Sequence, residues 1–235
     1  MTSVVLRDFV ELARVAARGA VELVGATAIE ILQWGFAEFG PGLAISASMQ
    51  DTVLAHLAAT VSPGVDVIFL DTGYHFVETL GTADAVEAVY DVTLRRIRPE
   101  LTVLEQDARY GARLHDRNPD LCCAMRKVAP LNSALEGYEA WATGVRRAES
   151  AARANTRVID FDSRRGKVKL APLAEWTDSD VEDYAAANGV LMNPLLQLGY
   201  PSIGCEPCTA AVVPGQDARA GRWSGSTKTE CGLHT

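Results

Sequence analysis

Apolar positions recur along the first forty residues with the spacing of amphipathic helices. They return every three to four residues over 10–17 and again over 26–39. Gly40-Pro41-Gly42 then interrupts the second pattern, as expected for the end of a helix. The pattern therefore predicts a helical part over residues 1–40.

Short apolar runs alternate with helical patterns in the next part of the chain. Strands are predicted at 43–46, 65–70, 92–97, 140–144 and 167–171. The helices expected beside them cover about 52–60, 76–90 and, with Thr177 as N-cap, 177–188. Strands that alternate with helices of this length are typical of parallel βαβ units. The sequence thus predicts an α/β fold with a parallel sheet flanked by helices.

Two polar loops follow predicted strands at the edge where such sheets bind ligands. They are Ser46–Asp51 and Asp71–Gly73. A strand-to-helix loop can offer backbone N–H groups to an anion. The first loop lacks the glycine run and the Lys-Ser/Thr pair of a Walker phosphate loop, so alone it indicates no particular ligand.

Composition and charge narrow the class of protein. The 235 residues suit one large domain, and 48% apolar with 22% charged residues is ordinary for a soluble globular chain. No apolar stretch reaches the roughly 20 residues that cross a bilayer, and no signal peptide is evident. We therefore expect a cytoplasmic protein that does not bind membranes. The net charge of −8 also argues against a nucleic-acid partner.

The charge is unevenly distributed. Residues 122–169 hold ten Lys and Arg against five Asp and Glu. A basic segment within an acidic chain points to a small anionic ligand, with a solvated charged face as the alternative. Arg126-Lys127 and the pair Arg219 and Arg222 could grip sulfate or phosphate oxygens.

Four of the five cysteines form two close pairs, Cys122-Cys123 and Cys205-x-x-Cys208. A disulfide framework is not expected in a reducing compartment. Four thiolates favour zinc or an iron–sulfur cluster. Adjacent cysteines point apart, which fits two irons of a cluster better than one zinc ion. A zinc site that only holds the C-terminal segment is the alternative.

The fifth cysteine, Cys231, lies near the C-terminus in Lys228–His234. Terminal segments are mobile unless other contacts hold them. A thiol there could enter a site, react and then move out to meet another protein. The alternative is an exposed cysteine without a role.

Four motifs together resemble one family. The chain resembles the assimilatory adenylylsulfate (APS) reductases of bacteria, within the PAPS/APS reductase family, over about 43–234. The motifs are Cys122-Cys123-x-x-Arg126-Lys127, Thr143-Gly144-x-Arg146-Arg147, Gly199–Cys208 and Lys228–His234. The resemblance implies an adenine-nucleotide α-hydrolase-like fold in a single domain over 1–235. This domain would have a helical part at 1–40, the nucleotide-binding sheet and cluster at 41–215, and a mobile catalytic tail at 216–235.

The resemblance also implies roles for individual residues. Cys231 would be the catalytic residue, and a 4Fe–4S cluster would be the cofactor. The cluster ligands would be Cys122, Cys123, Cys205 and Cys208. The substrate-binding residues would be Ser46, Ser48, Asp71, Lys127, Arg146, Arg147, Arg219 and Arg222. Relatives that reduce 3′-phosphorylated substrate lack these four cysteines, which points to adenylylsulfate.

The expected function is therefore thioredoxin-dependent reduction of adenylylsulfate to sulfite and AMP, through a Cys231 S-sulfo intermediate, in sulfate assimilation and cysteine biosynthesis. A PAPS reductase and a non-catalytic iron–sulfur or zinc nucleotide-binding sensor are the alternatives. The sequence leaves open whether the chain forms a homo-oligomer and what the cluster does in turnover. It assigns no role to His56, His75, His115 or His234.

Overall fold

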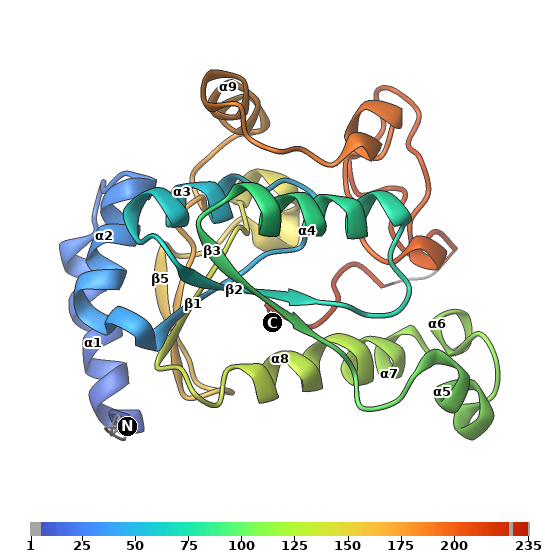
Figure 1. The fold of residues 1–235 in the computed structure, drawn as a ribbon, viewed down its shortest axis with the longest axis horizontal. Coiled ribbons are helices and arrows are strands. Elements are labelled where there is room, and N and C mark those ends of the chain that lie inside the picture. The colour runs from blue at the N-terminus through green and yellow to red at the C-terminus, as the bar shows by residue number, and fades with distance from the viewer. Residues whose placement is uncertain (1–5, 226–227, 235) are drawn as a thin grey trace.

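A twisted sheet of six strands forms the centre of the computed structural model, which describes residues 6–225 and 228–234 (Figure 1). The strand order is β3-β2-β1-β4-β6-β5. The strands are β1 (Leu43–Ser46), β2 (Val65–Leu70), β3 (Val92–Ile97), β4 (Ala140–Thr143), β5 (Ile159–Asp162) and β6 (Lys167–Leu170). All neighbours pair in parallel except β5 and β6, which are antiparallel.

Helices cover both faces of this sheet. α3 and α4 lie on one face, and α7 and α8 on the other (Figure 1). Four helices begin with a capping box, at Asp8, Thr27, Thr102 and Thr177, which satisfies their first backbone N–H groups. The helices are α1 (Phe9–Glu22), α2 (Ala28–Phe39), α3 (Val53–Val61), α4 (Val77–Val89), α5 (Val103–Tyr110), α6 (Leu114–Arg117), α7 (Pro119–Cys123), α8 (Ala129–Ala134) and α9 (Asp178–Asn188).

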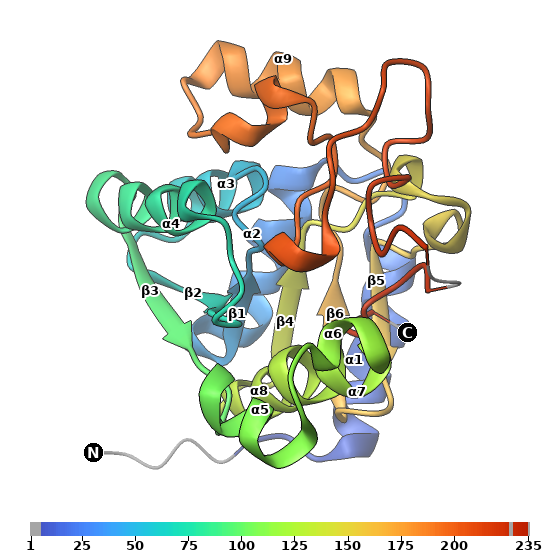
Figure 2. The same cartoon turned by 90° about the vertical axis from the view of Figure 1, so that its right-hand side faces the viewer.

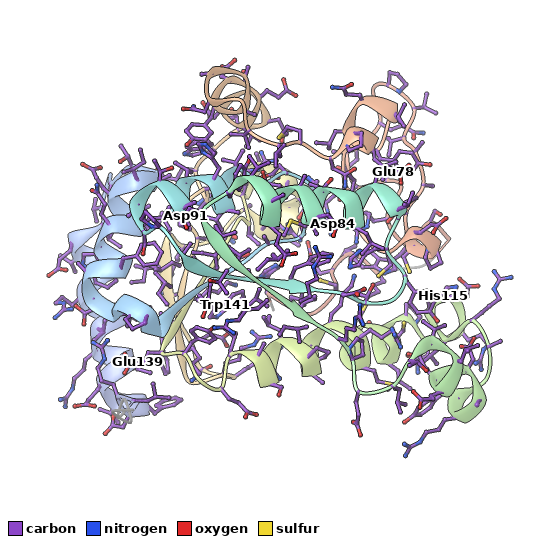
Figure 3. All side chains as sticks on the ribbon, in the orientation of Figure 1. Glu78, Asp84, Asp91, His115, Glu139 and Trp141 are labelled. Carbon is purple, nitrogen blue, oxygen red and sulfur yellow. The ribbon has the colours of Figure 1, made fainter. Side chains whose placement is uncertain are left out.

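Successive strand residues face opposite sides of the sheet, so the core has two parts. Ile45, Val67 and Ala142 belong to the larger part, which includes residues of α1–α4. Ala44 and Trp141 belong to the smaller part, with residues 131, 135 and 138 from α8 and the turn after it. Figure 3 shows Trp141 in the space between the sheet and α8. Leu233 of the C-terminal segment packs against this smaller part.

The strand order reverses between β1 and β4. The path β1-α3-β2-α4-β3 moves outward on one side, and β4, β6 and β5 lie on the other. The loops that follow β1 and β4 therefore separate at their carboxyl ends, which leaves a crevice in sheets of this kind. This crevice is where the predicted ligand loop at Ser46 lies.

The elements predicted from periodicity are confirmed to within about two residues, except that the first helix extends to Glu22, five residues beyond the predicted pattern. Two differences have physical reasons. β5 has the sequence Ile-Asp-Phe-Asp and lies at an edge of the sheet, so it alternates apolar and polar residues and forms no apolar run. It makes the sheet mixed rather than wholly parallel. The helices over 103–134 are short and are joined by a π-helical turn at Ala124–Val128, so no long apolar period marks them.

The core predicts a large stability difference between two identical substitutions. Leu32 in α2 is fully buried, whereas Leu104 in α5 is 82% exposed. We expect Leu32→Ala to lower the free energy of unfolding by about 2–5 kcal/mol, and Leu104→Ala to change it by less than about 0.5 kcal/mol. Urea unfolding followed by circular dichroism measures both. Equal losses would contradict this assignment of the core.

Candidate active site

A cavity opens at the crevice between β1 and β4. Several segments that are distant in the sequence line it: the loop after β1, the end of β4, the π-helical turn, and the C-terminal segment. The lining residues that matter below are Ser46, Ser48, Asp51, Thr143, Glu149, Lys127, Arg153, Ser202, Arg219, Arg222, Cys231 and His234. The structure therefore brings Ser46, Ser48, Lys127, Arg219, Arg222 and Cys231 together, as the sequence predicted.

The C-terminal segment is docked into this cavity. The Arg219 guanidinium donates from Nη2 to the backbone oxygen of Thr229 (2.8 Å). Lys169 Nζ donates to the backbone oxygen of His234 (3.4 Å), and the His234 ring stacks on Trp141 at 5.8 Å between centroids. Figure 2 shows this segment returning to the sheet beside β6. These contacts place Cys231 among the lining residues, and the mobility of the tail stays a prediction.

Lys127 and Arg222 carry positive charge in the cavity without a carboxylate partner. Among the described residues, Lys127 makes no hydrogen bond or ion pair, and the Arg222 side chain donates only to Ser202 Oγ (3.1 Å). Burial opposes the charged form of Lys127, but the thiolates of Cys205, Cys231 and Cys123 raise its pKa overall. Burial lowers the pKa of Arg222. An anion in the cavity would offset both charges.

The close fit around Arg222 explains a glycine beside the cysteine pair. A Cβ atom on Gly204 would lie 2.2 Å from Arg222 Nη2. The glycine therefore leaves the space that the guanidinium occupies, next to Cys205. The ring of Trp223 lies under the same guanidinium, 4.6 Å away, so Arg222 is held between backbone and aromatic ring.

Arg153 and Arg219 line the same cavity but are paired with carboxylates. Arg153 bonds Glu149 through Nη1 (2.6 Å) and Glu230 through Nε and Nη2 (2.9 and 2.8 Å). Arg219 lies 3.3 Å from Glu230. Arg153 was not among the predicted site residues. It belongs to the basic segment, but it lies in a short 3₁₀ turn, Ala151–Arg153, without a recognisable motif.

The four paired cysteines border one small cavity of their own, together with His115 and Pro119. Burial raises the pKa of Cys122 to about 12, and the charges of Cys123, Cys205 and Cys208 contribute to the rise. Burial, with Cys205, also raises the pKa of Cys208 to about 11. Four thiols brought this close together would favour a positive centre between them when they ionise. No single-ion site of three or more His, Cys, Asp or Glu side chains is present in the described part of the chain.

A π-helical turn over Ala124–Val128 joins the Cys122-Cys123 pair to α8 and orients two basic residues. Arg126 turns into the protein, where Nε donates to the Thr72 backbone oxygen (2.5 Å) and Nη1 to Gln106 Oε1 (3.0 Å). It thereby fixes the loop after β2. Lys127, one residue later, lines the cavity. Wide turns of this kind are frequent at functional sites.

Three predicted substrate-binding residues lie outside the lining of this cavity. Asp71 pairs with Arg98 at 3.0 Å. Arg146 is buried and bonds Asp178 (2.7 Å), and Arg147 bonds Glu175 (2.9 Å) at the surface. Arg146 and Arg147 follow Thr143-Gly144 in the sequence, but this position did not show that each of them pairs with a distant carboxylate.

Asp51 and Ser202 are cavity residues that the site prediction omitted. Burial raises the pKa of Asp51, and the charge of Arg146 opposes this rise. Ser202 Oγ accepts bonds from Arg222 and, at 3.5 Å, from Arg219. Both residues stand in segments that the sequence did mark, the Ser46–Asp51 loop and the Gly199–Cys208 motif.

The histidines fall into different environments. His56 contacts Tyr184 Oη (3.0 Å) away from the cavity, and His115 borders the cysteine pairs. His75 lines the main cavity, and its Nε2 lies 2.8 Å from the Leu70 backbone oxygen. His234 also lines it. Burial, with Lys169 and neighbouring arginines, lowers the pKa of His234 well below its ordinary value, so this ring is neutral at neutral pH.

Known proteins are similar to this chain in sequence and in fold. A reductase called adenosine 5′-phosphosulfate reductase from Streptomyces coelicolor is 59% identical over 224 residues, 95% of each chain. One of the same name from Mycolicibacterium smegmatis is 55% identical and covers 100% of this chain and 99% of its own. A crystal structure of phosphoadenylyl-sulfate reductase from Candida auris, in complex with phosphate, superposes with a TM-score of 0.72 at 31% identity, over 84% of this chain and 96% of that one.

No described helix has the length and apolar character needed to cross a membrane.

Residues 41–211 match the model of the phosphoadenosine phosphosulfate reductase domain. This match covers most of the chain and includes both cysteine pairs and the β1 loop. With these relatives, it shows that the chain belongs to the phosphoadenosine phosphosulfate reductase domain family.

Proposed function

We propose that this chain reduces adenylylsulfate to sulfite and AMP, with Cys231 as the nucleophile and a thioredoxin-type dithiol of the cytoplasm as the reductant. One observation carries the proposal. The Cys231 side chain lines a cavity with Lys127 and Arg222, two cations without a carboxylate partner among the described residues. That combination suits a thiol that attacks an anionic centre.

The first step forms a bond between the Cys231 sulfur and the sulfur of the sulfo group. The bridging oxygen–sulfur bond breaks, and AMP leaves with that oxygen and the electron pair. Thiolate and sulfo group repel each other, and negative charge builds on the leaving phosphate. Lys127, Arg222 and Arg219 offset both effects, and they help more as the charge develops than before it.

The second step consumes the S-sulfo group on Cys231. A thiolate of the reductant attacks the Cys231 sulfur, and sulfite leaves with the electrons of the sulfur–sulfur bond. The second thiol of the reductant then attacks the mixed disulfide. This releases Cys231 as thiolate and the reductant as disulfide, so the two electrons come from the dithiol.

We also propose a 4Fe–4S cluster as cofactor. Cys122, Cys123, Cys205 and Cys208 would hold it, since their four thiols border one cavity and thiolates are the usual ligands of such a cluster. When bound, the cluster would place a compact charge between the two chain segments that hold it, 122–123 and 205–208, and would so order both segments. Lys127 and Gly204, neighbours of these cysteines in the sequence, would thereby be held at the main cavity.

Two alternatives differ in substrate or in class. A reductase of the 3′-phosphorylated substrate would share the chemistry, but the relatives at 52–59% identity bear the name of the adenylylsulfate enzyme. A nucleotide-binding sensor would not need a thiol in the cavity.

The purified protein should release sulfite from adenylylsulfate and not from its 3′-phosphorylated form.

Trapping tests the nucleophile. Incubation with adenylylsulfate and no reductant should add one SO₃ group to the C-terminal peptide, read by mass spectrometry. Cys231→Ser should lose both the adduct and turnover while it still binds AMP. Sulfite production by this variant would remove Cys231 from the chemistry.

The cations that lack a carboxylate partner predict a selective loss of activity. Lys127→Ala should lower kcat/KM about 100- to 1,000-fold, the usual effect of removing one charge-stabilising donor. Arg157→Ala, whose side chain is 74% exposed and outside the cavity, is the control and should keep full activity. If both variants retained full activity in steady-state assays, Lys127 would have no part in the site.

Metal analysis tests the cofactor. Protein purified without air should contain iron and acid-labile sulfide in equal amounts. Cys205→Ser should lose both, whereas Cys231→Ser should keep both, because Cys231 is not among the proposed ligands. Zinc without sulfide in the wild-type protein would contradict the cluster.

A further inference from the structure

The carboxylate of Glu230, directly before Cys231, is held by two arginines from separate segments. Arg153 donates from Nε to Oε1 (2.9 Å) and from Nη2 to Oε2 (2.8 Å), a two-bond fork. Arg219 lies 3.3 Å from Oε1. All three side chains are 11–13% exposed, so solvent screens these contacts little.

The same contacts fasten the backbone beside the nucleophile. Arg219, which lies in the first part of the tail, also donates from Nη2 to the Thr229 backbone oxygen (2.8 Å), so two consecutive residues of its last part, Lys228–His234, are held just before Cys231. Within 228–234, Lys228 also pairs with Asp120, and its Nζ lies 5.6 Å from the centroid of the Trp223 ring. The contacts of Leu233 and His234 involve no carboxylate. Glu230 is the residue of this segment whose carboxylate is held by two guanidinium groups.

The pairing also changes the surroundings of the thiol. Glu230 carries a negative charge directly before Cys231, and two guanidinium groups pair with that charge. Although burial opposes it, the bond from Arg153 and the charges of Arg153, Arg219 and Arg222 lower the pKa of Glu230, so this carboxyl is ionised at neutral pH.

We propose that Glu230 is a positioning residue that latches the tail closed and so holds the Cys231 thiol in the cavity. Release of this latch then exposes the thiol to a reductant. The closed position of the tail is argued from the contacts above. The release of the thiol to a reductant rests on the proposed function. Arg153 and Arg219 serve both parts, because each lines the cavity while it bonds Glu230.

The test is the rate at which iodoacetamide alkylates Cys231 in the full-length protein without substrate, read on the C-terminal peptide by mass spectrometry. Glu230→Gln keeps the shape but turns an amide N–H₂ toward the guanidinium groups. We expect alkylation about tenfold faster, the factor that a 1.4 kcal/mol change gives an equilibrium. Glu230→Asp keeps the charge with a shorter reach, and we expect an intermediate rate.

Glu175→Gln is the matched control. It removes a carboxylate that bonds an arginine at 2.9 Å, Arg147, at a site that does not touch the tail. Its alkylation rate should equal that of the wild type. Equal rates for Glu230→Gln and wild type, or an equal acceleration in both variants, would overturn the latch.

Single-turnover kinetics separate latching from general damage. In Glu230→Gln, formation of the S-sulfo adduct should slow, and reduction of the preformed adduct by a dithiol should accelerate. A merely structural role would slow both steps. If the alkylation rates differ as expected but wild-type protein forms no adduct with adenylylsulfate, the latch stands and the proposed function fails.

Discussion

An electrostatic imbalance at the carboxyl ends of β1 and β4 underlies the whole site. The chain is acidic overall, yet Lys127 and Arg222 lack a carboxylate partner among the described residues, while Arg153 pairs with Glu149 and Glu230, and Arg219 with Glu230. Enclosed charge is costly unless something offsets it. The folded chain can therefore bind an anion at this position. Anion binding depends on where these cations lie and not on the net charge of the chain.

Sheet geometry explains why the tail and the cavity meet. Alternate residues of a strand share a face, so Thr143 lies on the same side of β4 as Trp141. Trp141 supports His234 from the tail, while Thr143 lines the cavity two residues further along. One face of the sheet thus provides both the platform on which the tail lies and the pocket that receives its thiol.

The sequence could predict elements with a clear period and residues in distinctive motifs. The apolar runs of β1 and β2 and the cap at Thr177 were sufficient for their elements, and the family resemblance placed Lys127, Arg222 and Cys231 in one site. Arg146 and Arg147 show the limit: their partners, Asp178 and Glu175, are about thirty residues away, and a charge pattern does not contain such pairings. Arg153 was missed for the converse reason, because long-range contacts alone bring it to the cavity.

The π-helical turn at Ala124–Val128 has a consequence for how this protein can vary in length. A regular helical turn takes 3.6 residues, and a π-helical turn closes its hydrogen bonds one residue further along. The extra residue is taken up inside the turn, so the Cys122-Cys123 half and α8 stay close to the phase of one continuous helix. Deleting one residue here would leave the cysteines facing nearly the same way, and it would instead move Arg126 and Lys127 away from the Thr72 loop and the cavity that they now reach. The turn thus allows two cysteines and two basic residues to be placed separately on one helical segment.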